Sequence, residues 1–226
     1  MSRILAVGSK ESLSRLDKLD GNIVPVQLIS FEPVPVAFAK NEFDWVFFGS
    51  RRGVRYFLDA VPVDSLKGVH FGCVGEKTAE ALRQRGMKAA FVPSRYSSTY
   101  WPTEFLEQFP DARGILFPTS DLSTFQPPKS FKEKGIQFQK LVVYRTVCAD
   151  TDFPEKEFQG VVFASPSCFN CFEEKWGLDV LRGKVLVAIG DVTGKAILDA
   201  GLSCSIPNRF TMADAIRHCR KQIESS

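Results

Sequence analysis

Short apolar runs alternate with amphipathic stretches along the whole chain, a pattern typical of strands alternating with helices rather than of hairpins. The apolar runs predict strands near residues 4–7, 24–29, 45–48, 69–74, 89–92, 115–117, 138–144, 161–163, 185–189 and 203–206. Most of the gaps fit helices; residues 77–85, for example, form an amphipathic stretch that Gly86 would end. Such alternation predicts the α/β class, with parallel sheets covered by helices.

The chain also contains an internal repeat. The segment DWVFFGSRRGVRYF, from Asp44, aligns with QGVVFASPSCFNCF, from Gln159, and VGEKTAEALRQRG aligns with IGDVTGKAILDAG in the same register. Ser50, Gly75, Thr78 and Gly86 align with Ser165, Gly190, Thr193 and Gly201, each 115 positions further along the chain. A weaker match pairs ILAVGSKES, from Ile4, with ILFPTSDLS, from Ile115. The repeat predicts two similar doubly wound domains, each with its own parallel sheet.

Both repeated signatures follow predicted strands, and ligands of doubly wound sheets bind beyond the carboxyl ends of strands. The repeat therefore predicts a cleft faced by both domains. In the two Gly-x-x-Thr turns, Thr78 and Thr193 stand at the start of a helix, where backbone N–H groups attract carboxylates or phosphates. Ordinary helix capping by the threonine hydroxyl is the alternative. The repetition of the turn leaves both interpretations open.

Composition is that of a folded soluble protein, with 226 residues, 44% of them hydrophobic and 24% charged. Lys and Arg number 29 against 26 Asp and Glu, and the resulting net charge of +3 does not favour a nucleic-acid partner. The apolar run at residues 4–7 is too short for a signal-peptide core, and no run is long enough to cross a membrane. We therefore expect a cytoplasmic protein with no membrane partner.

The chain has six cysteines, which we expect to stay reduced in the cytoplasm. Four of them have no close cysteine neighbour and are interpreted as buried small apolar residues: Cys73, Cys148, Cys204 and Cys219. Cys168 and Cys171 form a Cys-x-x-Cys pair at a predicted helix start, where a thioredoxin-like pair lowers its thiol pKa. The repeat places Gly53 and Tyr56 at the equivalent positions, which favours a structural role for this pair.

Signatures of cofactors are missing from the sequence. The run Gly190–Ala196 looks like a phosphate loop, but it has three residues between its glycines and alanine after its lysine. No Gly-x-Gly-x-x-Gly occurs, so ATP and NAD sites are disfavoured. With only His70 and His218, a three-histidine zinc site is impossible and histidine-based catalysis is disfavoured. We expect no metal and no cofactor.

Predicted loops are instead rich in hydroxyl groups, which would suit a neutral, polar cleft for a large polar ligand. These hydroxyls belong to Ser50, Ser97, Ser98, Thr119, Ser120, Tyr144, Ser165 and Ser167. Tyr144 ends the apolar run LVVY, where a strand is expected to give way to a connection. It is either a strand aromatic with a satisfied hydroxyl or a residue of the cleft.

The whole chain resembles the uroporphyrinogen-III synthase family. The resemblance rests on the order and spacing of DWVFFGSRRGVRYF, VGEKTAEALRQRGMKAAFVP, ILFPTSDLSTF, KEKGIQFQKLVVYRT, VVFASPSCFNCF and VAIGDVTGKAILDAGL. It implies a discontinuous first α/β domain, residues 1–30 and 147–226, and a second, inserted α/β domain, residues 31–146. Two linker strands, near residues 28–32 and 143–147, would join these domains.

The resemblance also implies a reaction: closure of the linear tetrapyrrole hydroxymethylbilane to uroporphyrinogen III, with loss of water and inversion of ring D. The implied reaction requires neither metal nor organic cofactor. The resemblance further implies a monomer that acts on this small molecule. Tyr144 would assist departure of the hydroxyl. Ser50, Thr78, Ser98, Ser165 and Thr193 match cleft positions, and Thr119 is expected to bind substrate, although relatives usually carry a basic residue or glycine at 119 and 120.

Two other classes of function share some of these features. A two-lobed binding protein for a polar or anionic small molecule would have the same architecture, but such proteins normally work outside the cytoplasm. A thiol redox protein would need Cys168 and Cys171 to form a reversible disulfide. A ring-closure assay on hydroxymethylbilane separates all three classes.

Overall fold

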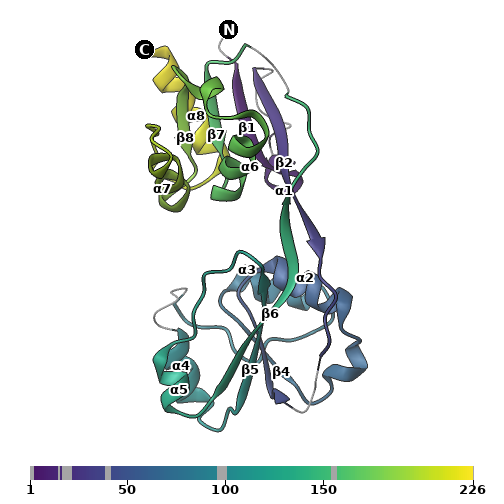
Figure 1. Ribbon diagram of the computed structural model, residues 1–226. Coiled ribbons are helices and arrows are strands. Elements are labelled where there is room, and N and C mark those ends of the chain that lie inside the picture. The colour runs from purple at the N-terminus through teal and green to yellow at the C-terminus, as the bar shows by residue number, and fades with distance from the viewer. Residues whose placement is uncertain are drawn as a thin grey trace. The chain divides into compact units, whose positions relative to one another are not determined.

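The structure is a computed structural model that describes residues 3–14, 16, 22–38, 42–95, 101–153 and 157–225. The chain forms two compact units (Figure 1). The first unit combines Met1–Ser30 with Val147–Ser226, and the second unit is Phe31–Thr146. No helix within the described ranges has the length and apolar character needed to cross a membrane.

The second unit is a parallel sheet with helices, in the strand order β4-β3-β5-β6. Its elements are β3 (Trp45–Phe48), α2 (Arg51–Ala60), a 3-10 turn (Val63–Leu66), β4 (His70–Cys73), α3 (Glu76–Arg83), α4 (Trp101–Gln108), β5 (Gly114–Ser120), α5 (Lys129–Glu133) and β6 (Gln137–Cys148). The last residues of β6, Val147 and Cys148, belong to the first unit.

The first unit repeats this plan in the strand order β8-β7-β1-β2, again with parallel pairs. Its elements are β1 (Ile4–Ser9), α1 (Lys10–Leu13), β2 (Ile23–Pro33), β7 (Gly160–Phe163), α6 (Pro166–Trp176), a 3-10 turn (Asp179–Leu181), β8 (Val185–Ala188), α7 (Asp191–Asp199) and α8 (Met212–Glu224). Under the repeat, β7, β8, β1 and β2 correspond to β3, β4, β5 and β6. The predicted α/β class with two similar parallel-sheet units is therefore confirmed.

The repeat extends to the ends of individual helices. Ser50 and Ser165 are the N-caps of α2 and α6, and each side-chain oxygen accepts a hydrogen bond from the backbone N–H three residues later. Gly86 and Gly201 follow α3 and α7 with φ of +79° and +78°, in the left-handed region that glycine enters without strain. The predicted stop at Gly86 is confirmed.

Two predicted strands, near residues 89–92 and 203–206, are reduced to single parallel bridges. Phe91 pairs with Gly72, and Ser205 pairs with Val187. A proline follows each of these short stretches, at 93 and 207, and proline has no N–H to extend a hydrogen-bonded ladder. The apolar pattern thus located the chain at the sheet edge but overestimated the pairing.

Two long strands, β2 and β6, contain the predicted linker segments 28–32 and 143–147. Each of these strands contributes residues to both units. Within the second unit, the Val34 N–H donates to the Val143 carbonyl at 3.0 Å. Within the first unit, the Ala149 N–H donates to the Leu28 carbonyl at 2.9 Å. The predicted linker segments therefore fall inside regular strands.

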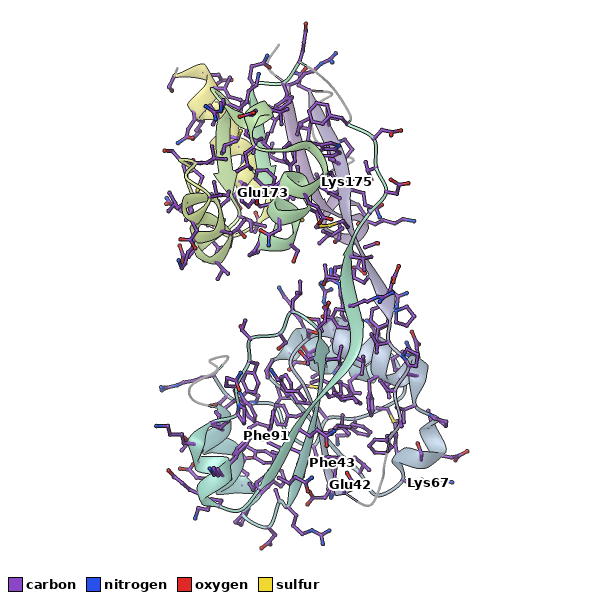
Figure 2. All side chains as sticks on the ribbon, in the orientation of Figure 1. Glu42, Phe43, Lys67, Phe91, Glu173 and Lys175 are labelled. Carbon is purple, nitrogen blue, oxygen red and sulfur yellow. A yellow bond between two sulfur atoms is a disulfide. The ribbon has the colours of Figure 1, made fainter. Side chains whose placement is uncertain are left out.

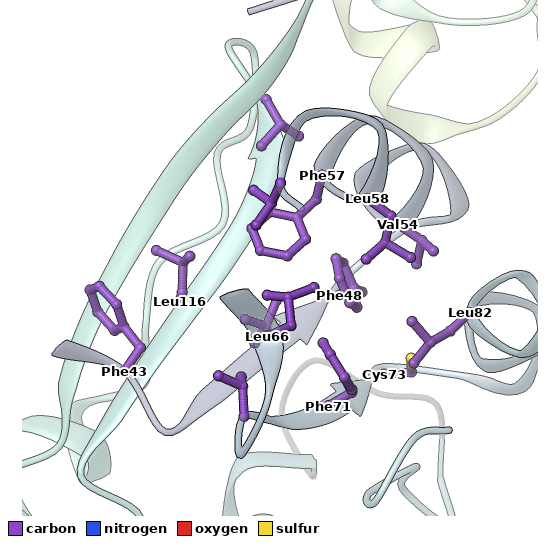
Figure 3. Packing of buried hydrophobic residues seen from close by; sticks show 14 of the residues in the cluster. Phe43, Phe48, Val54, Phe57, Leu58, Leu66, Phe71, Cys73, Leu82 and Leu116 are labelled. Atoms are coloured by element: carbon purple, nitrogen blue, oxygen red, sulfur yellow. The ribbon is translucent and has the colours of Figure 1, made fainter. Parts of the chain in front are cut away.

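Helices cover both faces of the sheet in the second unit, because successive side chains of a strand point to opposite faces. Val46 and Phe48 of β3 pack with Phe57 of α2 and Leu82 of α3, in the cluster drawn in Figure 3. Trp45 and Phe47 of the same strand pack on the other side, with residues of α4 and α5. This alternation explains why β3 is buried along its whole length.

The first unit has the same layered core. On one side of its sheet, Ile4 and Ala6 of β1 pack with Ala215 and Ile216 of α8. Phe163 of β7 meets the rings of Phe169 and Phe172 of α6, at centroid distances of 5.4 Å each. Each unit therefore buries its own hydrophobic core.

Candidate functional site

A cavity of about 800 Å³ lies within the second unit, at the carboxyl ends of its parallel strands. Loops that follow β3 and β4, the end of β5 and the loop after it, and one residue each of α4 and β6 form its walls. The lining residues are Gly49, Ser50, Val74, Gly75, Trp101, Phe117, Pro118, Thr119, Ser120, Leu122, Ser123, Thr124, Phe125 and Tyr144. This is the edge where doubly wound sheets bind ligands.

Two helices of the second unit begin at this cavity. Ser50, the N-cap of α2, accepts a hydrogen bond from the Gly53 N–H at 3.0 Å, and Gly75 is the N-cap of α3. Unpaired N–H groups and the helix dipole give each helix start a partial positive charge. Among the described lining residues there is no Asp, Glu, Lys, Arg or His, so in this part of the wall the helix starts are the source of positive charge.

Glycine is needed where α2 approaches β5. A Cβ atom on Gly53 would lie 2.8 Å from the Pro118 carbonyl oxygen, and one on Gly49 would lie 2.7 Å from the Phe117 ring. Such separations are too short for real Cβ atoms. The two glycines therefore let the start of α2 lie directly against the cavity wall formed by β5.

Tyr144 lies in the cavity wall and is 7% exposed. Its ring stacks on Tyr56 at a centroid distance of 5.0 Å and meets the edge of Phe31 at 5.9 Å. Within the described ranges, no protein group hydrogen-bonds its hydroxyl, whereas the neighbouring Tyr56 hydroxyl donates to the Phe31 carbonyl at 3.0 Å. The expectation that the strand ends at Tyr144 is wrong, because β6 continues to Cys148.

A β-bulge sets the position of Tyr144. Thr119 pairs with Val142, but Ser120 pairs with Tyr144, so Val143 is skipped between β5 and β6. Bulges of this kind re-aim side chains and are frequent beside active sites. The first unit has the corresponding bulge, where Ser9 pairs with Ile29. Ile29 therefore takes the place of Tyr144 in the first unit, and it has no hydroxyl.

The loop after β5 is tied to β6 by Asp121. The Asp121 N–H donates to the Tyr144 carbonyl at 3.2 Å, and the Asp121 carboxylate accepts from the Thr146 N–H at 3.1 Å. Lys140 donates to the Ser123 carbonyl at 3.3 Å. These bonds hold the lining loop 120–125 against the strand that carries Tyr144.

An aromatic wall completes the cavity, and no sequence motif had indicated it. Phe117 and Phe125 stack at a centroid distance of 4.7 Å, and Phe125 faces Trp101 at 6.2 Å. Trp101 is 1% exposed, and its buried indole nitrogen has no hydrogen-bond partner among the described residues. The only sequence signal was the phenylalanine at the end of ILFPTSDLSTF. Trp101 follows a stretch with no periodic pattern.

The predicted site residues are only partly brought together. Ser50, Thr119 and Tyr144 line one cavity, whereas Thr78 does not line it. Ser165 and Thr193 belong to the first unit. Ser165 is the N-cap of α6 and Thr193 is the third residue of α7, the places that Ser50 and Thr78 take in α2 and α3. Ser98 lies outside the described residues.

The interpretation of Thr78 and Thr193 as helix N-caps is wrong. Gly75 and Gly190 are the N-caps of α3 and α7, and neither helix has a side-chain capping bond. Thr78 and Thr193 are the third residues of their helices, 6% and 3% exposed. The glycines leave the helix starts open, because a glycine N-cap has no side chain to occupy the free N–H groups.

The cysteine expectations need a correction as well. Cys148 and Cys171 form a disulfide, so not all six thiols are reduced and Cys148 is not a buried apolar residue. The disulfide joins the end of β6 to helix α6, which carries Lys175 (Figure 2). Lys175 also donates to the Ala149 carbonyl at 3.1 Å. The two cysteines are 23 positions apart in the sequence, and the packing of α6 against β6 brings them together. The Cys-x-x-Cys spacing of Cys168 and Cys171 gives no sign of this pairing.

Cys168 is consequently not half of a Cys-x-x-Cys disulfide. It is a buried free thiol at the start of α6, and burial raises its pKa to about 11. Burial likewise raises the pKa of Cys73 and Cys219 to about 12. A reactive thiol requires the opposite shift. No group of three or more His, Cys, Asp or Glu side chains suited to a metal ion occurs within the described ranges.

Two repeated parallel-sheet units, one of them with a cavity at the carboxyl ends of its strands, define a doubly wound α/β protein. Comparison with known proteins identifies the family within this class. The family model "Uroporphyrinogen-III synthase HemD" matches residues 11–217. Because that match covers most of the sequence, the chain belongs to the uroporphyrinogen-III synthase family.

Curated relatives are distant in sequence. The porphyrin biosynthesis protein HemD of Ruminiclostridium josui is 21% identical over 238 residues, covering 95% of this chain and 47% of the relative. A putative uroporphyrinogen-III synthase of Archaeoglobus fulgidus is 26% identical over 155 residues, covering 63% of this chain and 66% of the relative. The chain thus spans about half the length of the first relative and about two thirds of the second.

Solved structures share the fold. Uroporphyrinogen-III synthetase from Helicobacter pylori has a TM-score of 0.74 at 16% identity, over 98% of this chain and 100% of that chain. A mutant uroporphyrinogen III synthase from Thermus thermophilus has a TM-score of 0.57 at 16% identity, over 100% of both chains. At this level of identity the likeness concerns the fold alone.

Proposed function

We propose that this protein is a uroporphyrinogen-III synthase, which closes hydroxymethylbilane to uroporphyrinogen III with loss of water and inversion of ring D. The match of the family model to residues 11–217 carries the proposal. The proposal includes the expected domains, residues 1–30 with 147–226 and residues 31–146.

The chemistry is an intramolecular rearrangement. Departure of the terminal hydroxyl leaves a cationic azafulvene, and the last pyrrole attacks it through the α-carbon that already carries the methylene bridge to the neighbouring pyrrole. The resulting spiro intermediate fragments by breaking the bond to the old bridge. The freed bridge carbon then bonds to the other α-carbon of the same pyrrole, which loses its proton, so that this ring is inverted. The protein must mainly fold the substrate into one conformation, which is catalysis by proximity and orientation. We expect the reaction to require no added metal or nucleotide.

Tyr144 is the proposed donor to the departing hydroxyl. The observations that support this role are its place in the cavity wall and the lack of a hydrogen-bond partner for its hydroxyl in the described part of the chain. A phenol can donate a proton or a hydrogen bond as the C–O bond breaks, so that the hydroxyl leaves as water. Ser50 and Thr119 line the same cavity and are proposed to bind substrate.

Substrate carboxylates are proposed to bind at the starts of α2 and α3. Both helices begin at the cavity, and the glycine N-cap of α3 leaves its first N–H groups without a side-chain partner. Thr78 then supports its helix start from the buried side. Ser98, Ser165 and Thr193 stay predicted cleft residues, as does the cytoplasmic, monomeric state of the protein.

The test is the isomer produced from hydroxymethylbilane. The purified protein is incubated with the substrate without added metal or nucleotide, the products are oxidised, and the porphyrin isomers are separated by chromatography. We expect isomer III. Isomer I alone is the product of uncatalysed closure and would refute the proposal; saturable binding without turnover would instead indicate a two-lobed binding protein. A thiol redox protein is disfavoured, because Cys171 is paired with Cys148 rather than with Cys168.

A further inference from the structure

A buried polar group in the second unit lacks a partner. Trp101 begins α4, is 1% exposed, and its Nε1–H has no hydrogen-bond partner in the described part of the chain. Buried indole N–H groups usually find an acceptor, because leaving one unpaired destabilises the fold. The aromatic contacts of the ring, among them a stack on Phe47 at 4.2 Å, leave the N–H itself unsatisfied. An acceptor supplied by a ligand would satisfy it.

The surroundings of Trp101 indicate the kind of ligand. Trp101 lines the cavity beside Phe117 and Phe125, and Leu122 adds a side chain that is 57% exposed. Polar groups line the same cavity, namely hydroxyl groups and the starts of α2 and α3. A ligand that fits both parts has a flat apolar ring and a negatively charged oxygen.

We infer that Trp101 is a substrate-binding residue of a subsite for one carboxylate-bearing pyrrole ring. Its Nε1–H donates to a carboxylate oxygen of that pyrrole, while the half-buried Phe125 contacts the face of the ring. The positive helix starts at Ser50 and Gly75 favour the same carboxylate. This inference rests on the proposed function, because a pyrrole with carboxylate side chains is the repeating group of the tetrapyrrole.

Trp101→Phe tests the hydrogen bond, and a matched control accounts for the buried volume that the change removes. The variant keeps an aromatic ring against Phe47 and Phe125 but has no N–H. Trp45→Phe is the matched control: Trp45 is 2% exposed, packs on Phe105 at 4.9 Å, and does not line the cavity. Both variants lose the same atoms from the same core, and only the first loses a proposed substrate contact.

Three measurements are made on the full chain: KM and kcat for hydroxymethylbilane, the isomer formed, and the midpoint of urea unfolding. For Trp101→Phe we expect KM to rise about tenfold, as for the loss of one hydrogen bond to a carboxylate, with little change in kcat. The unfolding midpoint should fall no further than in Trp45→Phe, because both changes remove the same buried atoms and Trp101→Phe loses no protein hydrogen bond. Phe125→Leu should raise KM about threefold by removing a ring contact.

Each contrary outcome has a distinct meaning. A wild-type protein that forms only isomer I refutes the proposed function itself. An active wild type with an unchanged KM in Trp101→Phe overturns the inference alone. An equal rise of KM in Trp45→Phe also overturns it, because that result would reflect general loosening of the core. Failure of Trp101→Phe to fold counts against it too, since the N–H would then serve the fold.

Discussion

Replacing Tyr144 by phenylalanine separates chemistry from packing in the proposed site. The variant removes one hydroxyl and leaves the ring able to stack on Tyr56 and to meet Phe31. Since that hydroxyl has no partner in the described part of the chain, no protein hydrogen bond is lost. We expect the free energy of unfolding to change by less than about 0.5 kcal/mol, as for substitutions that disturb no packing or buried bond.

The effect on catalysis should be much larger. If the Tyr144 hydroxyl assists departure of the substrate hydroxyl, turnover should fall by roughly 10²-fold, at the low end for a positioned proton donor. Substrate affinity should move far less, because several hydroxyls and two helix starts line the same cavity. The loss therefore belongs in kcat rather than in KM.

Tyr56→Phe is the matched control for this prediction. The two rings lie 5.0 Å apart, but Tyr56 does not line the cavity and its hydroxyl bonds the Phe31 carbonyl at 3.0 Å. This variant should lose about 1 kcal/mol of stability and keep its turnover. Initial rates of isomer III formation and urea unfolding of both variants decide the matter. Full turnover in Tyr144→Phe would show that Tyr144 is only a packing residue.

Two further predictions concern the frame around the site. Cys148→Ser breaks the disulfide and should lower the free energy of unfolding by about 3 kcal/mol, while Cys204→Ser should have little effect; urea unfolding under non-reducing conditions measures both. Gly53→Ala should destabilise the protein by about 1–3 kcal/mol, because its Cβ would meet the Pro118 carbonyl at 2.8 Å. Gly194→Ala should cost less, because the short contact of its Cβ, at 2.8 Å, is with Cδ1 at the end of the flexible Ile206 side chain; equal thermal midpoints for the two variants would contradict this prediction.

Much of the fold could be predicted from neighbouring residues in the sequence. Apolar runs located the strands, the 115-residue register of the repeat gave two similar units, and Gly86 and Gly201 ended their helices with positive φ. These features depend on local backbone preferences and on the burial of one face of each element. Short stretches of sequence are therefore enough to predict them. The two edge positions failed because a proline interrupts a ladder that hydrophobicity alone would extend.

The candidate site depended on tertiary structure. The sequence named Ser50, Thr119 and Tyr144, but it also named Thr78, which the helix start buries. Trp101 carried no local signal, since its neighbours in the cavity come from β5 and the loop after it.

The Cys148–Cys171 disulfide has the same origin, because only the packing of α6 against the end of β6 joins residues 23 positions apart. Local patterns were enough to specify two α/β units and open helix starts after their strands. Strand order, one skipped residue in the pairing of β5 with β6, and helix packing determined which side chains meet. The difference arises because a cavity is defined by distances between elements, whereas propensity and periodicity act within one element.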